Sequence, residues 1–358
     1  MKKIVVLGAG KIGRMVAHFL GHCGDYRLRI GDAAADAVQL VTDTVPGLEG
    51  RTVDFGSAAD LDAVLAGADA VISCAPFHCN PLIAARAKAN GLHYLDLTED
   101  VEVTREVMEL AKDADTAFIP QCGLAPGFIT ITAVHLIKDM TEVTDLRMRV
   151  GALPRYPSNM LKYNLTWSTE GLINEYCRPC EVIENGELRT VPPLEGLETI
   201  TIDGVEYEAF NTSGGLGTLA QTLRGKVRKV DYKSLRYPGH NYLIRFLLHD
   251  LQMRDNQEML ARILERCLPT TFQDQIVVFV SATGTYRGRL TERTYARTVR
   301  HQDIDGHNWS GIQITTAAGV CAVLDLLMQG RLPQRGLVRQ EQVDYLDFIA
   351  NRFGRYYA

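Results

Sequence analysis

The hydrophobic pattern of the first 120 residues alternates between short apolar runs and longer segments with helical spacing. Residues 4–7 form a continuous apolar run long enough for a strand buried on both faces, and apolar residues then recur at helical spacing through residues 11–20. The alternation continues, through a helix expected at residues 80–89 that stops at Gly91, to a strand expected at residues 116–120. Alternating strands and helices with short connections predict a parallel sheet with helices on both faces.

The pattern changes after Gly123, where strands follow one another and the turns ENGE and DGVE suit hairpins. We expect two helices, at residues 240–251 and 257–268, and strands at residues 145–152, 181–183, 188–191, 199–202, 205–210, 227–235, 276–285 and 292–300. An apolar helix at 313–328 and a terminal helix at 347–358 follow.

The predicted fold class is therefore α/β, with an N-terminal Rossmann dinucleotide-binding domain and a second α+β domain whose sheet is largely antiparallel. We place the first domain at residues 1–123 and the second, with the substrate and the subunit contact, at 124–310. The C-terminal helices at 311–358 could return to the first domain.

Three glycines, Gly8, Gly10 and Gly13, stand where the first strand turns into the first helix. Gly8 would allow the tight turn, Gly10 would let the backbone approach a pyrophosphate, and Gly13 would let the helix pack closely on the strand. The pyrophosphate would bind the N–H groups at the positive end of the helix. Ordinary turn glycines are the alternative, and the surrounding strand and helix favour the nucleotide site.

An acidic residue, Asp32, ends the second predicted strand about twenty residues after the glycines. A carboxylate at this position should accept hydrogen bonds from the adenosine ribose and would repel a 2′-phosphate. Three alanines follow it, with no arginine to attract such a phosphate. We therefore predict NAD as the cofactor, with NADP less favoured.

The composition is that of a globular protein that binds small molecules. The 358 residues are 46% apolar and 23% charged, and the formal net charge of -5 gives no support for nucleic-acid binding. The start is too glycine-rich for a signal peptide, and no stretch reaches the length needed to span a bilayer, since the most apolar segment carries Asp325. We expect a cytoplasmic protein without a membrane partner.

The eight cysteines are scattered, as expected of reduced thiols. Cys177 and Cys180 have the spacing of a redox or zinc pair, but no second pair or nearby histidines accompany them. We interpret this pair as incidental and predict no metal site.

Polar residues follow several strands of the first domain, at the edge where ligands of parallel sheets bind. His78 could move a proton near neutral pH, although a solvated loop histidine is the alternative. Asp96 ends the fifth strand and could face the cofactor, although a helix cap would also explain an acid there.

Several stretches of this chain resemble the saccharopine dehydrogenase family, and within it the lysine 6-dehydrogenase branch most. The most specific is VGALPRYPSNMLKYNLTWSTEGLINEYCRPCEVIENG at residues 150–186, and others are SCAPFHCNPLIAARAKANGLHYLDLTED, GLAPGF, EAFNTSGGLGTL and SLRYPGH. The resemblance covers nearly the whole chain.

The resemblance implies a Rossmann domain, a second domain that binds substrate and forms a homodimer, and oxidation of an amine carbon by a nicotinamide cofactor. In both named activities a hydride leaves the carbon that bears nitrogen at the lysine side-chain terminus. Water then hydrolyses the resulting imine to 2-aminoadipate 6-semialdehyde. A base must take the amine proton, since a protonated amine has no lone pair to expel the hydride.

Residues can be carried over from the family motifs position by position. The resemblance implies cofactor binding by Gly8, Gly10, Lys11, Ile12, Gly13, Asp32, Cys74, Ala75 and Pro76. The candidate catalytic residues are Asp96, His78, Arg236 and His240, and the candidate substrate-binding residues are Lys162, Tyr163, Trp167 and Arg236. An arginine fork suits a substrate carboxylate. The alternative role is a core ion pair for Arg236 and a helix cap for His240.

The chain also departs from the family pattern, which bears on the substrate. Ala125 stands where saccharopine reductases usually have Asp, which favours the lysine branch, while Asn164 and Ala152 replace a usual lysine and glycine in both branches. Lys162 could supply the missing charge.

The choice of substrate, and of function class, therefore stays open between several candidates. Saccharopine would need a second cationic subsite, for which Arg147, Arg149, Arg155 and Arg178 are available, whereas lysine would need fewer cations. A carboxylated polyamine of the carboxynorspermidine type is a third candidate, and a non-catalytic NAD-binding redox sensor is the alternative from another class.

Overall fold

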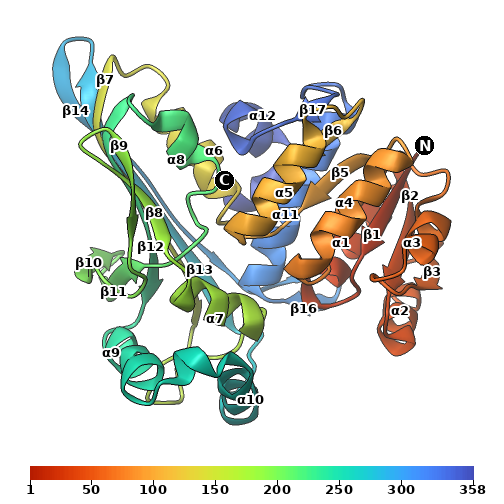
Figure 1. The fold of residues 1–358 in the computed structure, drawn as a ribbon, viewed down its shortest axis with the longest axis horizontal. Coiled ribbons are helices and arrows are strands. Elements are labelled where there is room, and N and C mark those ends of the chain that lie inside the picture. The colour runs from red at the N-terminus through yellow and green to blue at the C-terminus, as the bar shows by residue number, and fades with distance from the viewer. The chain divides into compact units, whose positions relative to one another are not determined.

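The computed structural model describes residues 1–358, which form two compact units (Figure 1). Unit 1 comprises Met1–Ile131 and Gln313–Ala358, and unit 2 comprises Thr132–Ile312. The boundaries fall within helix α6 (Phe128–Ile137) and near the start of helix α11 (Gly311–Met328), against predicted boundaries at 123/124 and 310/311. The C-terminal segment thus belongs to the same unit as the N-terminal residues.

Unit 1 is built on one seven-stranded sheet in the order β17-β6-β5-β4-β1-β2-β3, and every strand pair in it is parallel. The strands are β1 (Lys2–Leu7), β2 (Tyr26–Asp32), β3 (Glu49–Thr52), β4 (Ala70–Ser73), β5 (His93–Asp96), β6 (Ala117–Ile119) and β17 (Gly336–Leu337). The predicted Rossmann-like α/β domain is confirmed.

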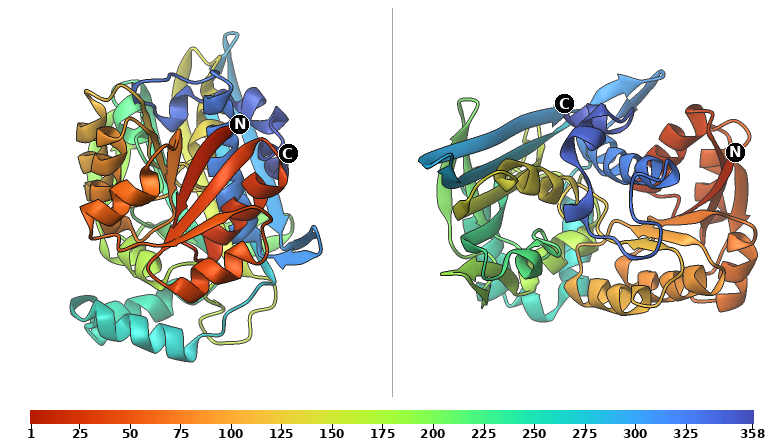
Figure 2. Two further views of the ribbon diagram at one scale, coloured as in Figure 1. Left: turned by 90° about the vertical axis from the view of Figure 1, so that its right-hand side faces the viewer. Right: turned by 90° about the horizontal axis from the view of Figure 1, so that it is seen from above.

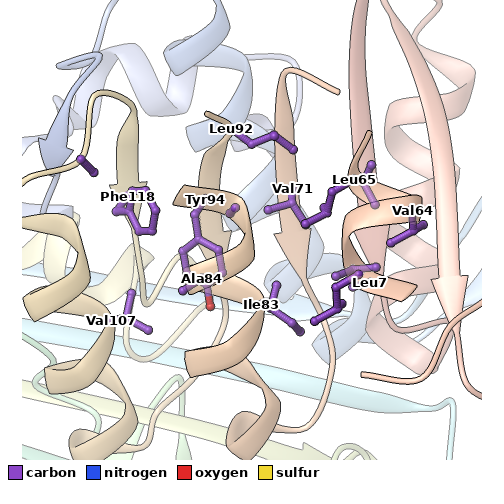
Figure 3. Packing of buried hydrophobic residues seen from close by; sticks show 14 of the residues in the cluster. Leu7, Val64, Leu65, Val71, Ile83, Ala84, Leu92, Tyr94, Val107 and Phe118 are labelled. Carbon is purple, nitrogen blue, oxygen red and sulfur yellow. The ribbon is translucent and has the colours of Figure 1, made fainter. Parts of the chain in front are cut away.

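Helices cover both faces of this sheet (Figure 2). The helices of unit 1 are α1 (Lys11–His22), α2 (Ala35–Thr42), α3 (Ala58–Leu65), α4 (Asn80–Ala89), α5 (Val101–Ala111), α11 and α12 (Tyr345–Ala350), with the first residues of α6 and with 3-10 turns η1 (Phe77–Cys79), η4 (Gln340–Gln342) and η5 (Gly354–Tyr357). Figure 3 shows side chains of α3, α4 and α5, such as Val64, Ile83 and Val107, packing on strand residues such as Val71 and Tyr94. Burial of this apolar surface is the main stabilising contribution to the unit.

The helix α11 corrects the expectation that no stretch of the chain reaches the length of a membrane span. It has 18 residues and is long and apolar enough by length and composition alone. However, 89% of it is buried inside the structure, which is what a core helix of this composition gives.

Unit 2 is built on a second sheet of eight strands, mostly antiparallel, as predicted. Its main order is β10-β11-β12-β7-β13-β14, with β8 paired to β12 and to β9, and β12 runs parallel to β7. The strands are β7 (Glu142–Pro154), β8 (Cys180–Glu184), β9 (Glu187–Val191), β10 (Glu198–Ile202), β11 (Val205–Asn211), β12 (Val227–Arg236), β13 (Asp274–Tyr286) and β14 (Arg289–Arg300), beside a separate hairpin of β15 (Gln302–Ile304) and β16 (His307–Trp309).

Most helices of unit 2 gather at one end of its sheet (Figure 1) around an apolar cluster that includes Tyr163, Tyr176 and Phe210. They are α7 (Thr169–Cys177), α9 (His240–Arg245) and α10 (Gln257–Cys267), with η2 (Phe246–Asp250) and η3 (Met253–Asp255), while the short helix α8 (Leu219–Leu223) lies apart from them. The single helix predicted at 240–251 is therefore two pieces, since a π-helical turn follows α9. The predicted terminal helix is likewise divided into α12 and η5.

A buried carboxylate holds the C-terminal segment in unit 1. Asp325 on α11 accepts hydrogen bonds from Tyr26 Oη (2.5 Å), Asn351 Nδ2 (2.7 Å), Arg352 Nη2 (2.8 Å) and Gln329 Nε2 (3.1 Å). It is 3% exposed, so its charge is compensated almost entirely by these donors. The residues come from β2, from α11 and from the chain after α12, and Asp325 therefore joins three parts of the unit.

We expect Asp325→Ala to lower the free energy of unfolding by about 3 kcal/mol or more, because it leaves several buried donors unpaired. The matched control is Asp347→Ala, which removes the half-exposed ion pair with Arg331 and should cost about 1 kcal/mol or less. Urea unfolding of both variants measures the difference. Equal losses would mean that Asp325 is no more than a surface partner.

Candidate active site

The glycine loop of unit 1 has the shape of a dinucleotide cradle. Gly8 has φ +104°, and a Cβ there would lie 2.5 Å from the Cys74 carbonyl oxygen, while a Cβ on Gly13 would lie 1.8 Å from the Gly8 oxygen. A Cβ on Gly10 would meet no protein atom within 4 Å. The space beside Gly10 is therefore open to a ligand, at the start of a helix whose N-terminus has no side-chain cap.

Asp32 fixes this loop to the end of β2. Its Oδ2 accepts a hydrogen bond from Ala9 N (2.6 Å) and its Oδ1 from Ala34 N (2.8 Å). The carboxylate thus stays at the end of β2, where a dinucleotide ribose binds in this type of fold. Cradle, helix end and acid together fit a nicotinamide dinucleotide held by Gly8, Gly10, Lys11, Ile12, Gly13 and Asp32.

The loop after β4 borders the cradle directly. Cys74 N donates to Leu7 O (2.7 Å), and the Cys74 carbonyl is the atom that excludes a side chain from Gly8. Burial raises the pKa of the Cys74 thiol to about 12, so the thiol stays protonated. Ala75 and Pro76 follow it, and His78 lies exposed on η1, with its ring edge-on to Phe77.

Asp96, the residue predicted to handle protons, lies in the core of unit 1. It is 0% exposed, and its carboxylate accepts hydrogen bonds from Tyr94 Oη (2.9 Å), Gln121 N (3.0 Å) and Thr98 N (3.1 Å). Burial raises its pKa to about 6, against the lowering effect of these donors. The contacts suit an anchor for the loops after β5 and β6 rather than contact with a substrate.

The predicted residues of unit 2 cluster around Arg236, at the end of β12. Arg236 is 3% exposed; its Nε donates to Tyr176 Oη (2.8 Å) and its Nη1 to Leu235 O (2.8 Å). The guanidinium lies over the Tyr163 ring, 5.2 Å from its centroid. No carboxylate forms an ion pair with it, so the predicted alternative of a core ion pair does not apply.

The acid nearest in the sheet is occupied elsewhere. Glu208 lies opposite Arg236 in the register of β11 and β12, but its carboxylate accepts hydrogen bonds from Gly239 N (2.9 Å) and Asn241 N. It thus serves the N-terminus of α9. The buried carboxylate of Glu175 acts on Arg236 electrostatically.

His240 is part of a hydrogen-bond chain that begins at Arg236. Its Nδ1 lies 2.8 Å from Leu161 O and its Nε2 lies 3.0 Å from Tyr176 Oη. Because a carbonyl only accepts, Nδ1 carries the proton and Nε2 accepts from Tyr176, whose oxygen in turn accepts from Arg236. Burial, with Arg236 adding to it, lowers the pKa of His240 to about 3. A neutral, tied imidazole of this kind does not suit the proton-transfer role predicted for it.

The other predicted substrate residues lie around the same cluster. Trp167 Nε1 donates to Tyr163 Oη (3.1 Å), and the Tyr163 and His240 rings are 5.4 Å apart. Lys162, with φ +50°, donates from Nζ to Pro238 O (2.9 Å) in the loop between Arg236 and His240. Its ammonium is therefore directed to a backbone carbonyl.

Two of the four arginines proposed for a second cationic subsite are neutralised. Arg149 is buried between Glu198 (2.6 Å) and Asp231 (2.5 Å), and Arg147 pairs with Asp145. Arg155 lies over the Tyr156 ring, and Arg178 Nε donates to Asn174 Oδ1 (3.2 Å).

The structure thus brings together two sets of predicted residues, one in each unit. It adds Tyr176, which the sequence analysis missed although this residue contacts both Arg236 and His240. The only signal was its place in the 150–186 motif, where it reads as one more apolar position of α7. Cys177 and Cys180 are buried free thiols whose pKa values burial raises, and no group of His, Cys, Asp or Glu side chains could hold a metal ion.

Comparison with known proteins agrees with this division of the chain. The family model of the saccharopine dehydrogenase NADP binding domain matches residues 4–119, and that of the saccharopine dehydrogenase C-terminal domain matches residues 123–355.

Individual relatives are distant. The mitochondrial alpha-aminoadipic semialdehyde synthase of Rattus norvegicus is 22% identical over 64% of this chain, which spans only 27% of that protein. The saccharopine dehydrogenase [NADP(+), L-glutamate-forming] of Pyricularia oryzae is 22% identical over 94% of this chain and 79% of its own length. The solved structure of apo saccharopine dehydrogenase (L-Glu forming) from Saccharomyces cerevisiae has a TM-score of 0.83 over 100% of this chain and 98% of its own, at 17% identity, and so shares the fold.

The buried position of Asp96 predicts a pH effect on stability. Its pKa of about 6 lies above the value of about 3.9 in an unfolded chain, so the folded state binds this proton more tightly. The stabilising contribution is therefore complete below about pH 4 and is lost as the pH rises through 6. In Asp96→Asn the contribution should disappear, since the amide oxygen can still accept from Thr98 and Gln121 and the amide nitrogen can donate to Tyr94.

Urea unfolding at about pH 4.5 and pH 7.5 tests this. The free energy of unfolding of the wild type minus that of Asp96→Asn should fall by on the order of 2 kcal/mol from the lower to the higher pH. A difference that does not change with pH would contradict the assignment.

Proposed function

Because this chain belongs to the saccharopine dehydrogenase family, we propose that it is a nicotinamide-dependent oxidoreductase that oxidises a carbon–nitrogen bond of a lysine-derived amino acid. One observation carries the proposal beyond the family: a buried guanidinium, Arg236, is held in place by Tyr176 and forms no direct ion pair with a carboxylate of the protein. Glu175 acts on it electrostatically, and a bound substrate carboxylate would supply the direct ion pair.

The chain's own residues suit the binding steps of such a reaction. Gly10 and the start of α1 would hold the pyrophosphate, and a bound nicotinamide would accept the hydride. Arg236 would bind the carboxylate at one end of the substrate and so fix the position of the other end, which carries the amine carbon. The amine reacts only when neutral, so turnover should rise with pH in the mildly alkaline range. Hydrolysis of the imine would give 2-aminoadipate 6-semialdehyde.

Among the candidate substrates, the charges in unit 2 favour one with a single carboxylate. Saccharopine carries two further carboxylates, and Arg147 and Arg149, two candidate cations for them, are already paired with acids. L-Lysine is therefore our first candidate and saccharopine, the substrate in the relatives' names, the second. A non-catalytic NAD-binding sensor would have no need of an unpaired buried guanidinium.

We also propose NAD rather than NADP, although the matching family model and the fungal relatives carry NADP in their names. The support is local: the Asp32 carboxylate is fixed by two backbone N–H groups at the end of β2, where a 2′-phosphate would meet a negative charge. Ala33, Ala34 and Ala35 follow it without a cation.

The proposed function predicts that the purified protein oxidises one of the candidate substrates. NADH formation is measured at mildly alkaline pH with L-lysine, saccharopine and a carboxylated polyamine offered separately. Arg236→Lys keeps the charge but loses the planar fork and the Tyr176 contact, and should raise KM for the active substrate by roughly 30-fold or more. Arg262→Lys, an exposed arginine of the same unit that pairs with Glu258 on α10, is the matched control and should behave as wild type. NAD binding without turnover of any substrate would support the sensor instead.

The second prediction concerns the coenzyme. Wild type should have the higher kcat/KM with NAD, and Asp32→Ala should reduce the NAD-to-NADP ratio by roughly tenfold or more, equivalent to about 1.4 kcal/mol, because the repulsion of a 2′-phosphate is removed. Steady-state kinetics with both coenzymes measure the ratio. A wild-type preference for NADP would overturn the assignment made from Asp32.

A further inference from the structure

The hydrogen bonds of His240 and Tyr176 have a direction, and the Leu161 carbonyl fixes it. This carbonyl can only accept, so it takes the Nδ1 proton of His240 from 2.8 Å away. The neutral imidazole then has a lone pair on Nε2, which accepts from the Tyr176 hydroxyl at 3.0 Å. Burial raises the pKa of Tyr176, so the hydroxyl keeps the proton that it donates. The Tyr176 proton therefore points to His240, and its oxygen lone pairs point elsewhere.

This direction decides what Tyr176 offers to Arg236. The Tyr176 oxygen accepts from Arg236 Nε at 2.8 Å, and the guanidinium carbon lies 5.7 Å from the Tyr176 ring centroid. If the hydroxyl proton pointed at Arg236 instead, two donors would face each other and Nε would lose its acceptor. Arg236, Tyr176 and His240 are all buried, and a buried donor without an acceptor costs free energy. The series of hydrogen bonds therefore strongly favours one orientation of the guanidinium.

A fixed guanidinium binds better than a mobile one, because an arginine side chain otherwise loses rotamer freedom when a carboxylate binds. Here Nε and Nη1 are held in advance, by Tyr176 and by the Leu235 carbonyl. We propose that His240 and Tyr176 are positioning residues: His240 directs the Tyr176 hydroxyl, and Tyr176 holds Arg236 in the orientation that binds the substrate carboxylate. This inference rests on the proposed function, and it gives His240 a role without proton transfer.

Two substitutions of His240 separate this role from simple anchoring of the loop at Leu161. In His240→Gln the amide lies near the position of Nε2, so it can accept from Tyr176 but gives up the bond to Leu161. In His240→Asn the amide lies near Nδ1, so it can donate to Leu161 but leaves the Tyr176 proton without its acceptor. Each variant loses one hydrogen bond, and only the second should disturb Arg236.

Tyr176→Phe has a matched control in Tyr237→Phe. The Tyr237 hydroxyl also has two partners in unit 2, since it accepts from Gln275 Nε2 (3.2 Å) and donates to Pro154 O (3.0 Å). Both variants remove a hydroxyl that has one donor and one acceptor, so the two losses of stability should be similar. Only Tyr176→Phe removes a hydrogen bond of Arg236.

The experiment uses the full chain, with kcat and KM measured for L-lysine and for saccharopine and the melting temperature measured with and without each substrate. We expect Tyr176→Phe to raise KM roughly tenfold to a hundredfold with kcat changed less, because a hydrogen bond of a charged group is lost, and Tyr237→Phe to keep the wild-type KM. His240→Asn should raise KM roughly tenfold, and His240→Gln should stay within about threefold of wild type. The double variant Tyr176→Phe/His240→Asn should have the KM of Tyr176→Phe, since His240 acts only through the hydroxyl.

The possible failures can be told apart. With an active wild type, equal KM values for Tyr176→Phe and Tyr237→Phe would overturn the role of Tyr176 and leave the proposed function standing. A higher KM in His240→Gln than in His240→Asn would overturn the direction assigned to the hydrogen bonds, and this comparison holds even if Tyr176→Phe does not fold. If the wild type shows neither turnover nor a melting shift with either substrate, the proposed function fails and this inference fails with it.

Discussion

A buried guanidinium needs both hydrogen bonds and a compensating charge, and Arg236 has its hydrogen bonds and the electrostatic influence of Glu175 but no direct ion pair. The contrast with Arg149 shows what full compensation looks like in the same sheet. Arg149 is equally buried, but it lies between Glu198 and Asp231. Arg149 therefore holds the sheet together, whereas the guanidinium of Arg236 is buried without a direct ion pair.

The residues around Arg236 fix the position of its guanidinium through hydrogen bonds. Tyr176 accepts from Arg236 and donates to His240, and Leu161 accepts from the other side of the imidazole. This series of hydrogen bonds needs an acceptor at each step, so the His240 imidazole must stay neutral. The low pKa of His240 follows from burial beside a cation. A histidine that looks catalytic in the motif is thus a fixed link, because its two nitrogens are both used.

The sequence predicts those features of the structure that depend on neighbouring residues, but not those that depend on contacts between distant parts of the chain. Helix α4 was predicted with its observed bounds because Asn80 and Pro81 mark its start and Gly91 its end. Strand β17 was missed because Gly336 and Leu337 form a strand only through pairing with β6, more than 200 residues earlier. The glycine loop and Asp32 could be recognised locally, since their geometry depends on neighbouring residues. Tyr176 could not, since its importance lies in contacts with β12 and α9 that no local pattern encodes.

The same reasoning explains why the sequence identifies Arg236 as a candidate residue but does not predict whether its guanidinium forms an ion pair. Its register partner is an acid, Glu208, and cross-strand opposite charges in a sheet normally pair. Here the carboxylate of Glu208 turns instead to two backbone N–H groups at the start of α9, because Gly239, at φ +98°, brings that helix end to the edge of β11. A helix N-terminus stabilises a carboxylate as an arginine would. The turn after β12 thus gives Glu208 backbone partners in place of Arg236, and the guanidinium has no ion pair with its cross-strand neighbour.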